Sequence, residues 1–282
     1  MAKESFKFIN TPTQFITASN GIKYAYRRMG KKSEVPIFFF NHLTSNMDNC
    51  DPRIMDSLAE HYEVFCFDYK GVGATSGKDA VSIQEMAKDC LALINAFGYS
   101  KIDIVSFSMG GFIAQELIEL EPTLVRKIVL AGTGPRGGKG VSDVVGLTYW
   151  DILKGYVTFK DPKYYLFFNS TKSNKTAAAE FLNRLKERKI DRDIPAKIRN
   201  LKAQLNAIKI WGYEKPADLS TIKIPVFVVN GDNDRMVPTP NSYDLAKRLP
   251  NATLHIYENS AHGAIFQFHE DFIKRTLAFL AS

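Results

Sequence analysis

The sequence lacks the features that mark secreted and membrane proteins. Its 282 residues include only 3 cysteines, Cys50, Cys66 and Cys90, an odd number without a C-x-x-C pair. We therefore expect reduced thiols rather than a disulfide framework. No apolar run approaches the roughly 20 residues of a membrane span, and the first residues lack the apolar core of a signal peptide. These absences predict a cytoplasmic protein that does not interact with membranes.

Motifs for metals, nucleotides and nucleic acids are also missing. The 5 histidines form no H-x-H or H-E-x-x-H pattern, so we expect no metal site. The net charge of +7 comes from scattered Lys and Arg, with local clustering only between Lys172 and Lys202, whereas nucleic-acid surfaces usually show a basic stripe. The glycines of residues 71–77 fit neither a dinucleotide motif nor a phosphate loop. We expect a small-molecule substrate, no cofactor and no nucleic acid, and the oligomeric state stays open.

The residues that are present indicate an α/β domain. The composition, 45% hydrophobic and 24% charged, is that of a chain with one large core. Residues 13–18 and 22–28 alternate apolar and polar side chains around Ser19-Asn20-Gly21, which predicts an opening hairpin. Continuous apolar runs follow and alternate with helical stretches, as in a mostly parallel sheet with right-handed crossovers. The predicted strands are residues 35–40, 62–67, a run beginning at 102, 127–131, 224–230 and 253–257.

The long interval between the strands at 127–131 and 224–230 needs its own explanation. So long a gap should not be a bare loop, and residues 143–156, 176–188 and 195–211 have helical spacing with few glycines. We therefore expect a helical cap, residues 136–217, inserted into a core made of residues 1–135 and 218–282. Helices are predicted at 241–248 and 264–280.

A serine stands where the central predicted strand stops and a helix begins. Ser108 has Ser106 and Gly110 two residues away on either side. Small flanking residues let the backbone turn sharply and leave the central side chain clear of both elements, which is the nucleophile elbow. An ordinary loop would also fit this short pattern. Ser106 is a poorer candidate, because its flanks would include the β-branched Ile104.

Two further polar residues follow later strands at the same edge of the predicted sheet. Asp234 follows the strand at 224–230, and His262 follows the last strand. The chain order serine, acid, histidine is that of a catalytic triad in which the imidazole takes the serine proton and the carboxylate orients the imidazole. Asp232 is the alternative acid, but its position favours an Asx turn.

Taken together, these motifs resemble the α/β-hydrolase family over nearly the whole chain. The stretches Asn-His-Leu-Thr-Ser-Asn, Gly-Val-Gly-Ala-Thr-Ser-Gly and Val-Asn-Gly-Asp-Asn-Asp are similar to those of capped bacterial hydrolases of esterase-like or cofactor-free haloperoxidase-like type. The resemblance implies a mostly parallel eight-stranded sheet flanked by helices. It also implies an oxyanion hole made by the backbone N–H groups of Met109 and Thr44, with Leu43 as the alternative to Thr44. Leu43 and Ser106 replace the glycines that are usual at these positions.

The sequence thus predicts a serine hydrolase for a small or medium hydrophobic carboxylic ester or a related acyl substrate. Two alternatives stay open: a hydrolase of carbon–carbon bonds in diketones, and a binding protein on the same fold that catalyses nothing. Aromatic residues of the predicted cap are expected mostly to pack it onto the core, while its inner face roofs an apolar pocket. These residues are Tyr149, Trp150, Tyr156, Phe159, Tyr164, Tyr165, Phe167, Phe168, Trp211 and Tyr213.

Overall fold

The chain enters the sheet through the predicted hairpin. In the computed structural model, which describes residues 7–282, strand β1 (Gln14–Thr17) pairs antiparallel with β2 (Lys23–Met29). Gly21 in the connecting turn has φ 74°, a left-handed conformation that glycine adopts without steric cost. The hairpin joins the sheet because β2 also pairs antiparallel with β4 (Val64–Phe67).

The remaining strands run parallel, as predicted for an α/β sheet. The eight strands of the described chain lie in the order β1-β2-β4-β3-β5-β6-β7-β8, and every pair from β4 to β8 is parallel. The strands not yet given are β3 (Ile37–Phe40), β5 (Ile102–Phe107), β6 (Val125–Ala131), β7 (Val226–Gly231) and β8 (Ala252–Tyr257). The prediction of a mostly parallel, eight-stranded sheet is confirmed.

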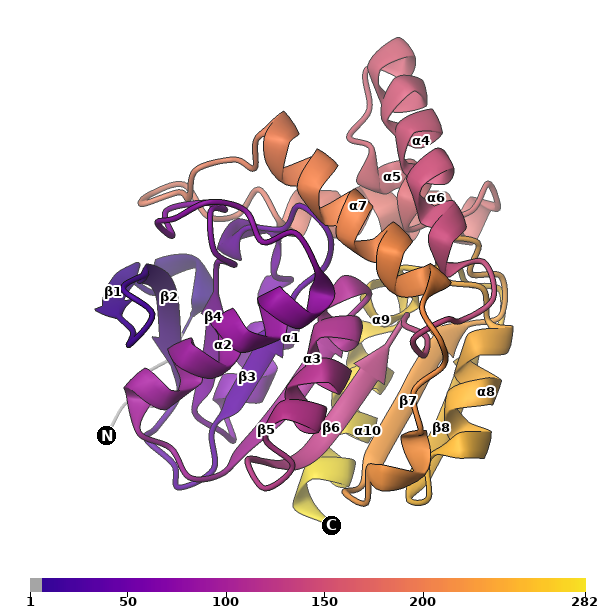
Figure 1. The fold of residues 1–282 in the computed structure, drawn as a ribbon. Coiled ribbons are helices and arrows are strands. Elements are labelled where there is room, and N and C mark those ends of the chain that lie inside the picture. Colours follow the sequence, from indigo (N-terminus) through magenta and orange to yellow (C-terminus); the bar gives the residue numbers. More distant parts are fainter. Residues whose placement is uncertain (1–6) are drawn as a thin grey trace.

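Helices cover both faces of this sheet (Figure 1). Alternate side chains of β5 point to opposite faces. Ile102 and Ile104 join the core beneath α2 (Ile83–Phe97) and α3 (Met109–Leu120). Val105 and Phe107 join the core beneath α1 (Pro52–Ala59) and α10 (His269–Ala281). Burying such a side chain stabilises the fold by roughly 1.5–3 kcal/mol. Within residues 7–282 the α-helices are α1 (Pro52–Ala59), α2 (Ile83–Phe97), α3 (Met109–Leu120), α4 (Val144–Thr158), α5 (Lys163–Leu166), α6 (Lys172–Arg184), α7 (Ile198–Tyr213), α8 (Pro240–Arg248), α9 (Ala264–Gln267) and α10 (His269–Ala281).

The terminal helix predicted at 264–280 is wrong in one respect, because the structure divides it into α9 and α10. Phe268 between them has φ −112° and ψ 37°, outside the helical region. Its ring stacks on Tyr257, with 4.8 Å between the ring centroids. The helix α9 begins two residues after His262, and α10 packs beside α1.

Four α-helices occupy the interval between β6 and β7 and lie above the strand ends in Figure 1. Three of them, α4, α6 and α7, correspond to the predicted stretches, and α5 is additional. That residues 136–217 form a separate domain stays a prediction, and we call them the inserted segment. None of the helices between residues 7 and 282 is both long and apolar enough to cross a bilayer.

The aromatic residues of the inserted segment do not behave as the sequence suggested. Phe167, Phe168 and Trp211 are buried, but Tyr149, Trp150, Tyr156, Phe159 and Tyr213 are between 46% and 96% exposed. The helix α4 instead turns Val144, Thr148, Asp151 and Gly155 inward. The prediction that most of the aromatics pack against the core is therefore wrong. Helical periodicity identifies an apolar face but not its neighbour, and here the more polar face of α4 is the one that packs.

Candidate active site

Ser108 lies at a strained turn between β5 and α3. Its φ of 56° and ψ of −122° fall outside the favoured regions for a residue with a Cβ atom, at a cost of roughly 1–3 kcal/mol. The turn requires glycine at position 110, because a Cβ there would lie 2.1 Å from the carbonyl oxygen of Phe40. Ser106 is buried, and its hydroxyl donates to the carbonyl oxygen of Val129 at 2.7 Å. Of the two serines, only Ser108 lies in the cavity described below.

The structure brings Ser108 together with His262 and Asp234. The Nε2 atom of His262 is 2.9 Å from the Ser108 hydroxyl oxygen, and Nδ1 is 2.7 Å from Asp234 Oδ2. Because the carboxylate accepts, Nδ1 carries the proton and Nε2 is free to accept from the serine hydroxyl. The backbone N–H groups of Met236 and Val237 donate to the other Asp234 oxygen at 2.8 and 3.0 Å. These bonds fix the carboxylate in a site that is closed to solvent.

Asp232, the alternative acid, has a different environment. Its two carboxylate oxygens accept from the backbone N–H groups of Asn259 and Ser260, each at 3.0 Å. Burial by itself raises the pKa of the Asp232 carboxyl, but these N–H groups outweigh it and hold the pKa below its usual value. Asp232 therefore braces the loop that carries His262 rather than contacting the imidazole.

The loop after β3 contains the predicted oxyanion donors and arranges them in an unexpected way. Thr44 has φ 54°, and its N–H donates to Oε1 of Gln204 on α7 at 2.6 Å. None of the described residues accepts a hydrogen bond from the Leu43 N–H. Met109, the third candidate, begins α3, so its N–H belongs to the unpaired first turn of that helix. Of the two loop candidates, Leu43 has the free N–H and Thr44 does not.

His42 is a residue near the site whose environment sequence reasoning missed. Burial, followed by the nearby charge of Lys163, lowers its pKa to about 3, so the ring is neutral. Its Nδ1 donates to the Leu43 carbonyl at 2.8 Å, and its ring packs edge-on against Phe167, with centroids 5.0 Å apart. His42 thus holds the Leu43 peptide in place. In the sequence, the Asn41-His42 pair directly after a buried strand was the feature that could have indicated this role.

A cavity of about 620 Å³ opens above Ser108 and His262. Charged side chains, among them Asp48, Lys163 and Arg192, also line it. The inserted segment contributes aliphatic, proline and charged side chains to the lining, and Phe167 is the single one of the ten aromatic residues to take part. The apolar lining of the cavity consists of Leu43, Phe112, Val144, Ile152, Pro162, Leu166, Phe167, Pro195, Ala196, Ile198, Leu201, Ile208, Met236 and Val237. Across residues 7–282 no three His, Cys, Asp or Glu side chains are grouped so that they could hold a metal ion.

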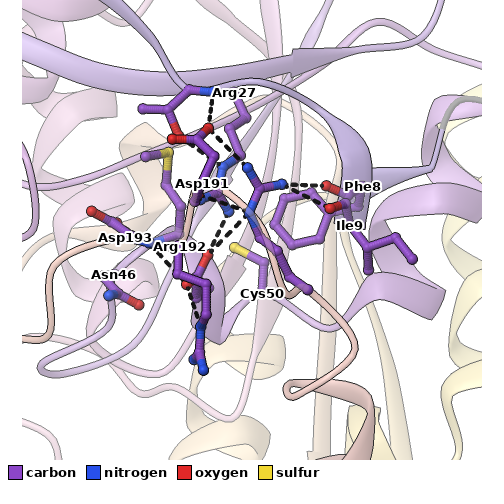
Figure 2. Close-up of polar contacts among 12 residues, drawn as sticks. Phe8, Ile9, Arg27, Asn46, Cys50, Asp191, Arg192 and Asp193 are labelled. Atoms are coloured by element: carbon purple, nitrogen blue, oxygen red, sulfur yellow. Dashed lines mark hydrogen bonds and ion pairs between the residues drawn. The ribbon is translucent and has the colours of Figure 1, made fainter.

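One wall of the cavity is anchored to the core by the network in Figure 2. The guanidinium of Arg188 donates to the carbonyl oxygens of Phe8 and Ile9, each at 3.1 Å. Arg27 and Asp48 form a buried ion pair at 2.8 Å, and Asp48 also accepts the backbone N–H of Asp193 at 3.0 Å. The stretch between α6 and α7 is therefore fixed to the loop that follows β3.

Two carboxyl groups meet in this network. The backbone N–H of Met47 lies 3.0 Å from Asp68 Oδ1 and 3.2 Å from Asp193 Oδ2. Burial raises the pKa of the Asp68 carboxyl well above its usual value, and the neighbouring Asp193 carboxyl raises it further. The Asp193 carboxyl thus makes ionisation of the buried Asp68 side chain less favourable.

Comparison with known protein families identifies the fold over most of the chain. The family described as alpha/beta hydrolase fold matches residues 35–268. A solved structure, an alpha/beta hydrolase fold protein from Chitinophaga pinensis, is 37% identical, with a TM-score of 0.91 over 98% of this chain and 99% of that chain.

Two curated relatives are more distant but cover most of both chains. A poly(3-hydroxyalkanoate) depolymerase of Ectopseudomonas oleovorans is 25% identical over 82% of this chain and 80% of that protein. A pimeloyl-(acyl-carrier protein) methyl ester esterase of Aliivibrio fischeri is 22% identical over 80% of this chain and 86% of that protein.

Proposed function

The chain belongs to the alpha/beta hydrolase family and is a hydrolase, and we propose that it cleaves small or medium hydrophobic carboxylic esters by serine catalysis. The observation that carries this proposal is the chain of two hydrogen bonds from Ser108 through His262 to Asp234. A serine hydroxyl is a weak nucleophile by itself, so an imidazole must take its proton as it attacks. The geometry supplies such an imidazole in the correct tautomer.

In the proposed reaction Ser108 Oγ attacks the ester carbonyl while its proton passes to His262 Nε2. Asp234 stabilises the imidazolium that forms and does not itself take the proton. The imidazolium then protonates the leaving alcohol, which leaves an acyl group on Ser108. Water, deprotonated by the same imidazole, releases the acid and restores the serine. Every proton transfer in this cycle passes through His262.

The negative charge that develops on the carbonyl oxygen requires donors already in place. We assign this role to the backbone N–H groups of Met109 and Leu43. Leu43 is chosen over Thr44 because the Thr44 N–H already donates to Gln204, whereas the Leu43 N–H has no partner among the described residues. Removing one such donor from an enzyme of this type typically lowers turnover by roughly 10²- to 10³-fold.

The shape and lining of the cavity support a hydrophobic acyl or alcohol group. The cavity has a volume of about 620 Å³, and about half of its lining residues are apolar, among them Leu43, Ile152 and Leu201, which suits an uncharged chain or ring of small or medium size. The name of one curated relative, the methyl ester esterase, refers to ester cleavage, which supports an ester over a carbon–carbon bond.

A fluorophosphonate probe and a series of p-nitrophenyl esters test this proposal together. The probe reacts with an activated serine, so mass spectrometry should locate it on Ser108. The kcat/KM values for acetate, butyrate, hexanoate and decanoate esters should rise and then fall as the chain outgrows the cavity. Labelling elsewhere, or a protein that cleaves diketones but none of the esters, would overturn the assignment.

A further inference from the structure

Gln204 links the inserted segment to the oxyanion loop. Its side chain is 1% exposed and extends from the middle of α7, and its Oε1 accepts the Thr44 N–H at 2.6 Å. Only the amide oxygen can accept from an N–H, so the orientation of the amide follows from the contact. The bond joins residues 160 positions apart. It connects a helix above the cavity to the backbone beside the proposed oxyanion site.

The residue that Gln204 holds is in an unfavourable conformation. Thr44 has φ 54°, and a β-branched residue rarely occupies this left-handed region. Such a conformation persists only where the surroundings determine it. The Thr44 hydroxyl donates to the Leu43 carbonyl at 2.8 Å, and His42 Nδ1 donates to the same oxygen at 2.8 Å. Gln204 is the partner of the Thr44 N–H, so it completes the set of bonds that holds this turn.

The consequence concerns the Leu43 N–H. With the Thr44 N–H occupied by Gln204 and the Leu43 carbonyl held by two donors, the turn leaves the Leu43 N–H without a partner among residues 7–282. Leu43, Thr44 and Ser108 all line the same cavity. If the Gln204 bond were lost, the Thr44 N–H would be a second unpaired donor and the strained turn could relax.

We propose that Gln204 is a positioning residue for the oxyanion hole: its amide oxygen holds Thr44 in the left-handed conformation and thereby orients the Leu43 N–H toward the reacting carbonyl oxygen. This inference rests on the proposed serine esterase function. It adds that α7 of the inserted segment helps build the catalytic geometry as well as the roof of the cavity. Gln204 itself does not touch the substrate.

Asn200, one turn earlier on the same helix, provides a matched control. It is 1% exposed, and its side-chain amide donates to the Gly71 carbonyl at 2.9 Å. Like Gln204, it fastens α7 to a loop of the core through a buried hydrogen bond. Unlike Gln204, it bonds to no residue of the oxyanion loop. Loss of Asn200 therefore measures what a purely structural contact of α7 contributes.

The test compares Gln204→Met, Gln204→Glu and Asn200→Leu. Methionine keeps the length of the side chain but removes the acceptor, whereas glutamate keeps an acceptor oxygen. Each variant is assayed for kcat and KM with the preferred p-nitrophenyl ester. Each is also assayed for inhibition by a matching trifluoromethyl ketone. In that complex Ser108 Oγ bonds to the ketone carbon, its proton passes to His262, and the ketone oxygen becomes an oxyanion. Thermal unfolding shows which variants are folded.

We expect Gln204→Met to lower kcat by roughly 10- to 100-fold, part of the loss seen when an oxyanion donor is removed. KM should change little, and the ketone inhibition constant should rise in parallel with the loss of kcat. Gln204→Glu should restore most of kcat, and Asn200→Leu should lower the melting temperature without changing the ketone inhibition constant. Should Gln204→Met fail to fold, Gln204→Asn replaces it. The asparagine side chain is one methylene group shorter, so it keeps a polar amide but moves the amide oxygen away from the Thr44 N–H, and it should give the same pattern.

Three results would overturn the inference. A folded Gln204→Met with unchanged kcat and ketone inhibition would show that the bond does not matter for the chemistry. A rise in kcat would show that Gln204 competes for a donor that the reaction uses, namely the Thr44 N–H. Equal effects in Asn200→Leu would reduce Gln204 to a general fold contact. A wild-type protein that hydrolyses no ester and does not bind the ketone would instead overturn the proposed function, and this inference with it.

Discussion

The Oδ2 atom of Asp234 lies 2.7 Å from Nδ1 of His262, while Asp232, two residues earlier, faces the backbone of the loop before His262. Two carboxylates on one loop thus have separate tasks. One contacts the imidazole, and the other shapes the loop that carries it. The difference can be measured by replacing each aspartate with its amide.

Asp234→Asn should lower kcat by roughly 10⁴-fold, because an amide at this position favours the wrong imidazole tautomer. Asp232→Asn is the matched control. It loses acceptor capacity toward Asn259 and Ser260 and should cost about 1 kcal/mol of stability, with kcat close to that of the wild type. Steady-state kinetics and thermal unfolding of both variants are the measurements. An inactive Asp232→Asn beside an active Asp234→Asn would reverse the assignment of the acid.

Ser108→Ala should fold normally and lose turnover by roughly 10⁴-fold or more, since the three residues act as one unit. The change also removes no packing contact, because the Ser108 side chain faces the cavity. Ser106→Ala, two residues away, removes a buried hydrogen bond to the Val129 carbonyl and should cost about 1 kcal/mol of stability. Its kcat should stay near the wild-type value. The opposite pattern of activities would move the nucleophile to Ser106.

Filling the cavity should select against long substrates. Leu201 lines the cavity from α7, and Leu201→Trp should lower kcat/KM for a hexanoate ester by about 10-fold or more while leaving the acetate ester little changed. Asn206→Trp places the same side chain on an exposed position of the same helix and should leave both values unchanged. Equal losses for both esters in Leu201→Trp would mean that the acyl chain does not lie along this wall.

The carboxyl pair of Asp68 and Asp193 should make stability depend on pH. Because the pKa of Asp68 is raised in the folded state, the folded protein binds more protons than the unfolded chain, and stability falls as pH rises from about 3.8 through the raised value. Asp193→Asn removes one charge and supplies a donor to Asp68. Its melting temperature should exceed that of the wild type by a margin that grows as pH rises through the raised pKa of Asp68.

Asp191→Asn is the control, because the pKa of Asp191 is shifted in the opposite direction to that of Asp68. The backbone N–H of Thr13 is the main cause that lowers the pKa of Asp191, and the charge of Arg188 adds to it. The ionised carboxylate therefore contributes stability that is present above about pH 3.8 and is lost as pH falls through the lowered value. Asp191→Asn should thus be less stable than the wild type at neutral pH. An Asp193→Asn variant that is also destabilised at neutral pH would contradict the unfavourable effect of the Asp193 charge on Asp68.

Much of the fold could be predicted from the sequence because the decisive patterns are local. Apolar runs such as residues 35–40 are buried on both faces in any parallel sheet, and the turn at Gly21 required a residue tolerant of positive φ. The chain order of Ser108, Asp234 and His262 also lies within the sequence. Parallel strands carry the residues that follow them to one edge of the sheet, so the three were expected to meet there.

Other features depended on contacts that no local pattern encodes. The sequence by itself determined which residues form strands and helices and which polar residues follow the strands, since backbone sterics and apolar periodicity act over a few neighbours. Only the tertiary structure decided that α4 turns its aromatic side chains to solvent, that Asp193 meets Asp68, and that Gln204 takes the Thr44 N–H from 160 positions away. Each of these features depends on how elements far apart in the sequence pack together, which is a property of the whole core.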